Sequence, residues 1–272
     1  SQRYGEGRDA CNFCGHNHMG CYQRAKSSTD LTYWPRALRS GAVIETGARV
    51  RRVTTDDAGR ATGADYVDSK GNERHQSARA VIMAANGIGT PRLLLNSAND
   101  AHPTGLANSS GLVGKNLMFH PFATVTGVFS ENLESYKGPI GCSVFSHEFY
   151  ETDPYRDFVR GYGLQVVRSS GPVHTAVGGI GGHTIPWGES HHDIFSEQFG
   201  KTISVGVMGE DLPEECNHVL LDKNLTDSDD IPAAKVIYRM SNNSLKMMDH
   251  GIARAGELLE ASGTKKVLVN PL

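Results

Sequence analysis

The chain has 272 residues, of which 38% are hydrophobic and 21% charged, and its formal net charge at pH 7 is −3. These values are typical of a soluble globular protein with one or two domains. The small net charge gives no reason to propose a nucleic-acid partner, and no apolar run approaches the roughly 20 residues of a membrane-spanning helix. We expect a soluble protein, cytoplasmic or periplasmic, and because the chain begins with Ser1 the sequence leaves its targeting open.

The first part of the chain predicts little regular structure. Residues 1–28 are polar and contain several glycines, which is typical of an irregular loop. Asp30–Ser40 predicts a short helix, and Gly41 is placed to end it as a C-cap. Ala42–Glu45 then predicts a short strand.

The next segment has the pattern of a β-meander. Arg49–Val53 and Ala64–Val67 alternate apolar and polar residues, and Glu73–Ala78 provides a third strand. Asp57–Arg60 and Ser69–Asn72 predict the two turns between them.

A strand, a glycine turn and a helix are predicted after the meander. The apolar run Ala80–Ala85 has the length of a strand, Gly87 and Gly89 follow it, and Thr90–Pro91 is a typical helix start. Such a unit offers backbone N–H groups and a helix N-terminus to a nucleotide. However, Arg92 stands where the dinucleotide fingerprint has its third glycine, so an ordinary turn of an α/β sheet remains an alternative.

The pattern of predicted elements changes after residue 120. A loop at 99–116 precedes the predicted strands Phe122–Phe129, Ile203–Met208 and Lys235–Tyr238. Ser244–Ala261 predicts an amphipathic helix whose apolar stripe is Leu245, Met248, Ile252, Ala255 and Leu259. We therefore expect a cofactor-side domain at 1–120, a substrate-side domain at 121–240, and a final segment at 241–272 in which a helix returns to the first domain.

Three of the five cysteines cluster near the N-terminus. Cys11, Cys14 and Cys21, with His16 and His18 between them, supply ligand types that suit zinc or an iron–sulfur centre. The second ligand pair of such sites is absent, so a glycine-rich loop with reduced thiols is the alternative.

Other polar groups predict mainly structural roles. We expect surface or hydrogen-bonded positions for the histidines His120, His174, His183, His191, His192 and His218. Most of the paired acids are typical of solvated turns; they are Glu210–Asp211, Glu214–Glu215 and Asp227 with Asp229–Asp230. No P-loop, nucleophile elbow or His-Glu-x-x-His motif occurs.

Several motifs together resemble the glucose–methanol–choline (GMC) oxidoreductases, and among them the bacterial sugar and gluconate dehydrogenases and pyranose-oxidase-like enzymes. They are Arg24-Ala-Lys-Ser-Ser-Thr29 with Thr32-Tyr33, Gly47-Ala-Arg-Val50, Thr90-Pro91 with Leu94-Leu95, and the passage from Ala107 to His120-Pro121. Asn86-Gly87 and Ala98-Asn99 depart from the residues that usually flank Thr90-Pro91 in this family.

The resemblance implies an α/β fold with an α+β substrate part: a partial FAD-binding domain of the glutathione-reductase type and an antiparallel-sheet substrate domain. The family's N-terminal Gly-x-Gly-x-x-Gly and its C-terminal catalytic histidine have no counterpart here. We therefore expect an internal fragment of a longer enzyme, inactive by itself, with no catalytic residue of its own and the histidine beyond Leu272.

A few residue roles carry over from the resemblance. The backbone of Val50 is expected to contact the adenine, and Asn116 and His120 to lie near the edge of the isoalloxazine. Ala84, Ala85 and Gly87 match a turn beside the ADP half of FAD. Glu210 and Asp211 match a segment that lines the substrate cavity.

The implied reaction is hydride transfer from the carbon of a small alcohol or sugar to the flavin. The acceptor that reoxidises the flavin is left open among oxygen, a quinone and a redox protein, and an iron–sulfur centre on the cysteine loop would serve as a relay. Two other functions remain open: a metal- or iron–sulfur-binding module on Cys11, Cys14 and Cys21, and an NAD-linked two-domain oxidoreductase.

Overall fold

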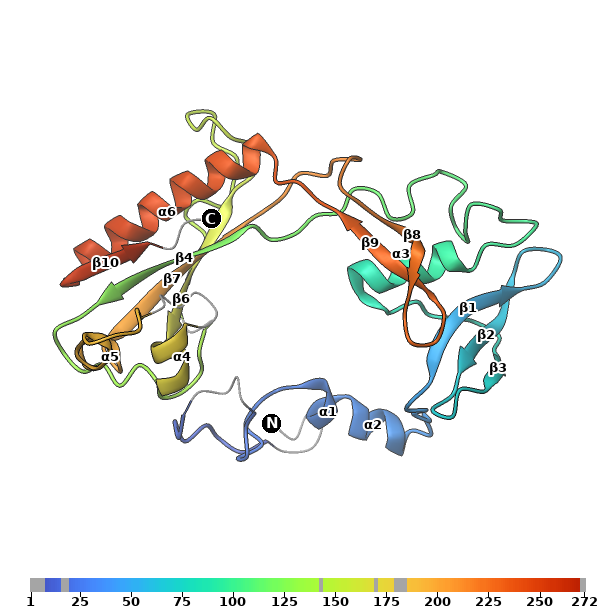
Figure 1. Ribbon diagram of the computed structural model, residues 1–272, viewed down its shortest axis with the longest axis horizontal. Helices are drawn as coiled ribbons and strands as arrows, with labels where there is room; N and C mark the ends of the chain where they lie inside the picture. Colours follow the sequence, from blue (N-terminus) through green and yellow to red (C-terminus); the bar gives the residue numbers. More distant parts are fainter. Residues whose placement is uncertain (1–7, 16–19, 142–143, 169–170, 179–184, 270–272) are drawn as a thin grey trace. The chain divides into compact units, whose positions relative to one another are not determined.

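The computed structural model describes residues 8–15, 20–141, 144–168, 171–178 and 185–269. The chain forms two compact units (Figure 1). The first, here called the sheet unit, comprises Ser1–Ala42, Phe119–Asp211 and Met240–Leu272. The second, here called the meander unit, comprises Val43–Met118 and Leu212–Arg239. Each unit is described by itself.

The sheet unit is built on a five-stranded antiparallel sheet with the strand order β10-β4-β7-β6-β5. Its strands are β4 (Phe122–Val128), β5 (Phe145–Ser146), β6 (Tyr162–Arg168), β7 (Thr202–Gly209) and β10 (Lys266–Val269). The predicted strands that begin at Phe122 and Ile203 are confirmed as β4 and β7. The combination of helices with antiparallel sheet is also confirmed.

The long helix α6 (Asn242–Ala261) lies along this sheet and packs on β4 and β7 (Figure 1). It begins at Ser241, whose side-chain oxygen accepts a hydrogen bond of 3.0 Å from the backbone N–H of Ser244. This is a standard N-cap, and it satisfies one of the donors that the first helical turn leaves unpaired. Gly263, with φ of 83°, follows the helix.

The buried face of α6 differs in part from the predicted apolar stripe. Met248, Ala255 and Leu259 are buried as expected, but Leu245 is 41% exposed. The buried residues that the stripe missed are Ser244, Met247 and Gly251. The reason is close packing: a Cβ on Gly251 would overlap a methyl group of Val207, so the helix rests on the sheet along the row that contains this glycine.

Strands β4, β6 and β7 and helix α6 enclose the core of the sheet unit. Val125, Val205 and Val207 are at most 2% exposed, and Val125 faces Val205 across the ladder. The Tyr162 ring is buried, and a hydrogen bond of 2.7 Å joins its hydroxyl to Nδ1 of His250 on α6. Burial raises the pKa of Tyr162 and lowers that of His250, so this pair stays neutral at pH 7.

The shorter helices of the sheet unit are α1 (Thr29–Thr32), α2 (Trp34–Arg39), α4 (Pro172–Val177) and α5 (His191–Gln198). The single helix predicted at Asp30–Ser40 is thus divided at Tyr33, while Gly41 ends it as expected, with φ of 90°. The strand predicted at Ala42–Glu45 is wrong. No described strand pairs with this segment, and Val43 is 88% exposed.

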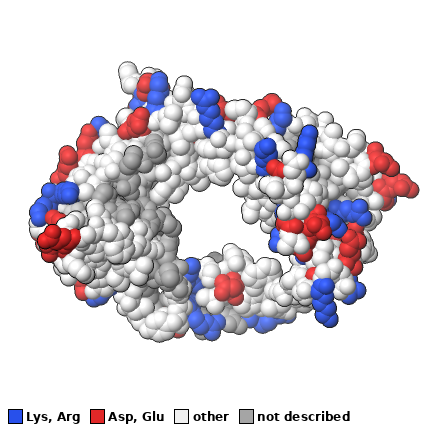
Figure 2. All heavy atoms as spheres, viewed as in Figure 1, with Lys and Arg blue, Asp and Glu red and all other residues white. Residues whose placement is uncertain are grey.

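The meander unit contains the predicted three-stranded meander. Its strands are β1 (Arg49–Thr55), β2 (Ala61–Val67) and β3 (Glu73–Ser77), paired antiparallel in that order. Charged side chains of both signs are interspersed over it, as Figure 2 shows, and they pair as Arg52 with Asp65 and Arg74 with Asp68. The unit is completed by helix α3 (Asn86–Asn96) and the hairpin of β8 (His218–Thr226) and β9 (Pro232–Ile237). The strand predicted at Lys235 is confirmed as part of β9.

The predicted strand–turn–helix after the meander is only partly correct. Residues 80–85 have no regular secondary structure and join no ladder among the described strands, and Ile82 is 90% exposed. Helix α3 begins at Asn86 and not at Thr90–Pro91, which lies inside it. The reason is side-chain capping: Asn86 Oδ1 accepts hydrogen bonds of 3.0 Å from the N–H groups of Ile88 and Gly89, which starts the helix earlier.

Alanine substitutions at two glycines of α6 are expected to change the stability of the protein in opposite directions. A Cβ on Gly251 meets Val207, whereas a Cβ on Gly256 meets no heavy atom within 4 Å. We expect Gly251→Ala to lower the free energy of unfolding by about 1–2 kcal/mol, because overpacking outweighs the gain in helix propensity. Gly256→Ala should raise it by about 0.5–1 kcal/mol. Urea denaturation of both variants measures this, and equal stabilisation by the two changes would contradict the packing described for α6.

Candidate functional site

The residues expected at the site fall in both units. The meander unit holds Val50, Ala84, Ala85, Gly87 and Asn116, and the sheet unit holds His120, Glu210 and Asp211. The cysteine loop belongs to the sheet unit. His16, His18, Cys142 and His183 lie outside the described residues.

Val50 lies at an irregularity of strand β1. β1 is an edge strand of the described meander, and its register with β2 shifts between Val50 and Arg52 and again between Thr54 and Thr55. The carbonyl of Arg51 turns to the other side and accepts a hydrogen bond of 2.8 Å from the Asn96 side chain of α3. An edge strand keeps one row of backbone groups that no neighbouring strand pairs. Val50, itself 40% exposed, therefore has a backbone suited to contact a ligand.

Ala84 and Ala85 lead into helix α3, and Gly87 lies in its first turn. Gly87 is exposed, and the position of a Cβ on it has no heavy atom within 4 Å. The N–H of Ala85 donates to Oγ1 of Thr90 at 3.1 Å, and Asn86 already occupies the next donors of the helix start. This segment consequently has open space beside Gly87, but the N–H groups of Ala85, Ile88 and Gly89 are already hydrogen-bonded within the protein and are not free to bind a phosphate.

Arg92 holds α3 against the β8–β9 hairpin. Its guanidinium donates hydrogen bonds to the Pro232 carbonyl at 2.7 Å, to Asp227 Oδ2 at 2.9 Å and to the Ile231 carbonyl at 3.0 Å. Burial opposes ionisation of Asp227, but the Arg92 hydrogen bond and backbone N–H groups keep the pKa of this carboxyl below its usual value. The expectation of a solvated turn is therefore wrong for Asp227. Arg92 was noticed in the sequence only as a missing glycine, and no local pattern linked these distant residues.

Asn116 occupies a constrained position in the passage before β4. Its φ of 58° is in the left-handed region, which asparagine tolerates better than most residues. The flanking backbone is fixed by a hydrogen bond of 2.9 Å from Leu117 N–H to the Asn217 carbonyl and by one of 2.7 Å from Val219 N–H to the Gly114 carbonyl. These hydrogen bonds fix the backbone on both sides of Asn116.

His120 lies at the entry to β4, beside the end of β7. Its Nδ1 is 3.3 Å from the carbonyl oxygen of Gly209, and because a carbonyl only accepts, this contact requires a proton on Nδ1. The next residue continues the pairing, since Gly209 N–H donates to the Pro121 carbonyl at 2.8 Å. The fold thus brings His120 next to Glu210 and Asp211, which are about 90 residues away in sequence.

The two acidic neighbours of His120 differ completely in environment. Asp211 is 5% exposed; its Oδ1 accepts a hydrogen bond of 2.6 Å from Ser244 Oγ and its Oδ2 one of 3.1 Å from the N–H of Phe119. Glu210 is half exposed and lies 3.9 Å from the guanidinium of Arg160. Asp211 therefore joins the end of β7 to α6 and to the entry of β4, and it is no solvated turn residue.

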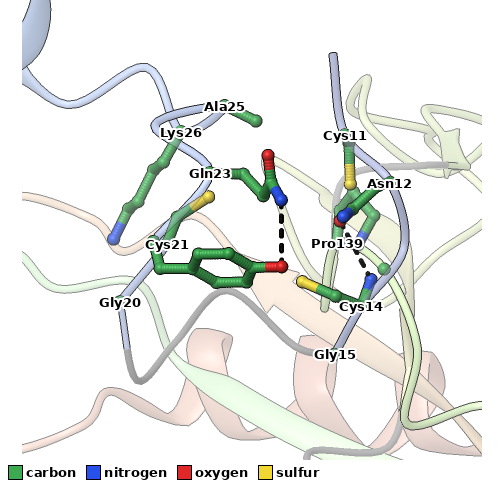
Figure 3. A pocket seen from close by; sticks show the side chains of 12 residues that line it. Cys11, Asn12, Cys14, Gly15, Gly20, Cys21, Gln23, Ala25, Lys26 and Pro139 are labelled. Atoms are coloured by element: carbon green, nitrogen blue, oxygen red, sulfur yellow. Dashed lines mark hydrogen bonds between the residues drawn. The ribbon is translucent and has the colours of Figure 1, made fainter. Parts of the chain in front are cut away.

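Cys11, Cys14 and Cys21 line one cavity of about 300 Å³, together with Lys26 and Pro139 (Figure 3). In the part of the chain that the structure describes, no group of three or more His, Cys, Asp or Glu side chains is arranged to hold a metal ion. The described cysteines are all free thiols. The cavity is thus a thiol-lined space and carries no support for the metal-binding alternative.

Comparison with known proteins identifies the family. Residues 4–122 match the family model described as GMC oxidoreductase. The chain belongs to the GMC oxidoreductase family. This confirms the resemblance seen in the motifs around Thr29, Val50 and Pro121. No described helix of this GMC chain is long and apolar enough to cross a membrane.

The similar proteins include several bacterial dehydrogenases. The chain is 45% identical to the 2-methyl-1,2-propanediol dehydrogenase of Mycolicibacterium austroafricanum over 95% of its own length and 47% of that protein. It is 27% identical to the fructose dehydrogenase large subunit of Gluconobacter japonicus, over 87% of the chain and 43% of that subunit. It is 26% identical to the gluconate 2-dehydrogenase flavoprotein of Pantoea cypripedii, over 97% and 44%. The chain thus spans about half the length of these curated relatives.

Substitution of the neighbouring acids Asp211 and Glu210 tests how much the hydrogen bonds of Asp211 contribute to stability. Asp211→Ala leaves the buried Ser244 hydroxyl and the Phe119 N–H without their acceptor, so we expect a loss of about 2–4 kcal/mol in the free energy of unfolding. Glu210→Ala removes only a long, half-exposed ion pair and should change stability by less than about 0.5 kcal/mol. Chemical denaturation of both variants measures the difference. Equal small effects would mean that the Asp211 contacts contribute little.

Proposed function

We propose that this chain is part of an FAD-dependent enzyme that oxidises a CH–OH group of a small alcohol or sugar. The observation that carries the proposal is the 45% identity, over 95% of the chain, to a protein named as a diol dehydrogenase. The names of the fructose and gluconate dehydrogenases also refer to hydroxylated compounds. Bound FAD would supply the hydride acceptor, and oxygen, a quinone or a redox protein would take up the electrons.

The residues of the meander unit fit the adenine end of this cofactor. An irregular edge strand at Val50 has backbone groups suited to hydrogen-bond an adenine, and its exposed side chain suits an apolar ring. The turn at Ala84, Ala85 and Gly87 has room beside Gly87 for the ADP half of FAD. Since its donors are satisfied by Asn86 and Thr90, we assign the pyrophosphate to residues outside this chain and give the turn a flanking role. This agrees with the absence of a third glycine.

The residues of the sheet unit fit the substrate end. His120 would lie near the isoalloxazine edge, and Glu210 would border the alcohol; Asn116, for which a place near the same edge is proposed, belongs to the meander unit. Asp211 would act as a positioning residue, because it holds the backbone before His120 and the start of α6. Removal of the hydroxyl proton is assigned to a histidine outside this chain, so the role of these residues is to bind and orient.

The proposed roles follow the two units. The meander unit would form the FAD side, as part of a glutathione-reductase-type domain, and the sheet of β4, β6 and β7 would form the substrate side. Residues 212–239 would then belong with the FAD side although they follow the expected boundary at residue 120. Helix α6 would belong with the substrate side, because it packs on β4 and β7.

The reaction class is tested on the purified full-length protein. We expect visible flavin absorbance that bleaches anaerobically when a small diol or sugar alcohol is added and does not bleach with NADH or NADPH. Reduction by NADH or NADPH alone would favour an NAD-linked oxidoreductase. A protein with stoichiometric zinc and no flavin would favour a metal-binding module on the cysteine loop.

The flanking role of the glycine turn makes a separate prediction. Gly87→Leu places a side chain in space that the protein leaves open, so stability should be unchanged while the dissociation constant for FAD rises about tenfold, which corresponds to about 1.4 kcal/mol. Gly256→Leu is the matched control, because Gly256 is also an open helical glycine and lies on α6. Flavin fluorescence titration of the two apoproteins measures the constants. Unchanged FAD binding by Gly87→Leu would remove this turn from the cofactor site.

A further inference from the structure

The sheet of the sheet unit has one face against α6 and one face directed away from it. Because side chains alternate along a strand, and paired residues of neighbouring strands share a face, Val125 and Val207 lie on the first face, in the core with Met248 of α6. Phe122 and its partner Met208 lie on the second face, here called the far face. The far face therefore consists of every second residue of β4, β6 and β7.

His120 and Glu210, the residues proposed for the substrate end, continue the far face past the ends of β4 and β7. The pairing of the two chain segments goes on there, since Gly209 N–H donates to the Pro121 carbonyl at 2.8 Å. His120 stands two residues before Phe122, and Glu210 stands two residues after the partner of Phe122 on β7. Alternation therefore directs both side chains to the same face as the Phe122 ring.

The contacts of Asp211 support this assignment. Asp211 follows Glu210 and bonds to Ser244 of α6 at 2.6 Å, so its side chain points to the face that α6 covers. Glu210, one residue earlier, consequently points away from α6, and it lies 3.9 Å from the guanidinium of Arg160.

Two phenylalanine rings lie on the far face near this end. The Phe122 ring covers Gly206, because a Cβ on this glycine would be 3.0 Å from the ring. The Phe145 ring of β5 covers Gly163 in the same way, since a Cβ there would overlap it. A glycine leaves room on the face of a sheet, and here an aromatic ring fills that room. The two phenylalanines remain 38% and 41% exposed, so they present apolar surface at this end of the face.

The Phe122 ring separates the accessible end of the far face from a buried part. His120 is exposed, whereas Thr124 and Thr126, the next residues of β4 on this face, are 4% and 7% exposed. Thr124 is paired with Gly206, the glycine that the ring covers. A molecule at the His120 end therefore meets the Phe122 ring before it reaches the row of Thr124.

We propose that Phe122 is a specificity-determining residue, which limits this end of the far face to a short acyclic alcohol and excludes a sugar ring. The proposal rests on the proposed function, which puts the alcohol beside Glu210. The hydroxyl would lie at the polar residues His120 and Glu210, and the carbon chain would pack on the Phe122 ring.

The chemistry of a sugar ring does not suit this end of the face. A sugar carries hydroxyls on most of its carbons, and those against the phenyl ring would lose their hydrogen bonds to water without gaining a partner. A ring-shaped alcohol would also need the space over Gly206 that Phe122 fills.

Ligand binding to the full-length, FAD-containing protein tests the role of Phe122. The probes are tert-butanol and 1-methylcyclohexanol, tertiary alcohols that have no hydrogen on the carbinol carbon and therefore bind without being oxidised. Their dissociation constants are measured from the perturbation of the flavin absorbance. We expect Phe122→Ala to lower the constant of 1-methylcyclohexanol about tenfold relative to that of tert-butanol, because the variant opens the space over Gly206.

Further variants control for the position of the ring. Gly206→Ala places a Cβ against the Phe122 ring and pushes the ring toward the accessible end, so the ratio of the two constants should change in the opposite direction. Leu258→Ala removes a 45% exposed side chain of α6, on the other side of the sheet, and should leave the ratio unchanged. Phe122→Leu keeps part of the apolar bulk and should give an intermediate ratio, which maintains the test if Phe122→Ala fails to fold.

The outcomes separate this proposal from the proposed function. If alcohols bleach the flavin but the ratio is the same in the unaltered protein and in Phe122→Ala, Phe122 does not determine specificity. A larger kcat/KM for glucose than for 1,2-propanediol would contradict the assignment of a short acyclic alcohol. A protein that lacks flavin, or whose flavin no alcohol bleaches, would overturn the proposed function itself and this proposal with it.

Discussion

The buried carboxylate of Asp211 is the contact on which the arrangement of the sheet unit depends. It accepts hydrogen bonds from Ser244 Oγ at 2.6 Å and from the N–H of Phe119 at 3.1 Å, so one side chain joins the end of β7 to the first turn of α6 and to the chain entering β4. The Ser244 side chain is fully buried, and leaving its hydroxyl without this acceptor is costly. His120 and Glu210 flank this contact, which is why their relative position is well defined.

In the meander unit, too, one hydrogen-bonded side chain joins several segments, and there it is the cation Arg92. Arg92 of α3 reaches Asp227 and two carbonyls of the β8–β9 hairpin, so a mostly buried guanidinium replaces an apolar contact between helix and hairpin. Its planar donors match several acceptors at once, which a lysine could not do. In both units, a charged group with satisfied partners positions the segments to which cofactor and substrate roles are assigned.

The elements that could be predicted from sequence are those whose signal is local. The meander follows from alternation and turn residues at Asp57–Arg60 and Ser69–Asn72, and α6 follows from its apolar period. The failures have a common cause. The segments 42–45 and 80–85 have the composition of strands, but a strand exists only when a neighbour pairs with it, and no described strand does. Similarly, Leu245 fits the period of α6, but the closest approach of the helix to the sheet is at Gly251.

The amino-acid sequence by itself determined the GMC family, the three-stranded meander and the cysteine loop, because each depends on residues close together in the chain. Only the tertiary structure decided that Asp211 is a buried anchor while Glu210 remains half exposed, that His120 lies against Gly209, and that Arg92 pairs with Asp227. It also decided that Cys14 and Cys21 share one cavity. The physical reason is that most of these relations join residues far apart in sequence, and burial and hydrogen-bond partners are set by which segments pack together, which no local pattern encodes.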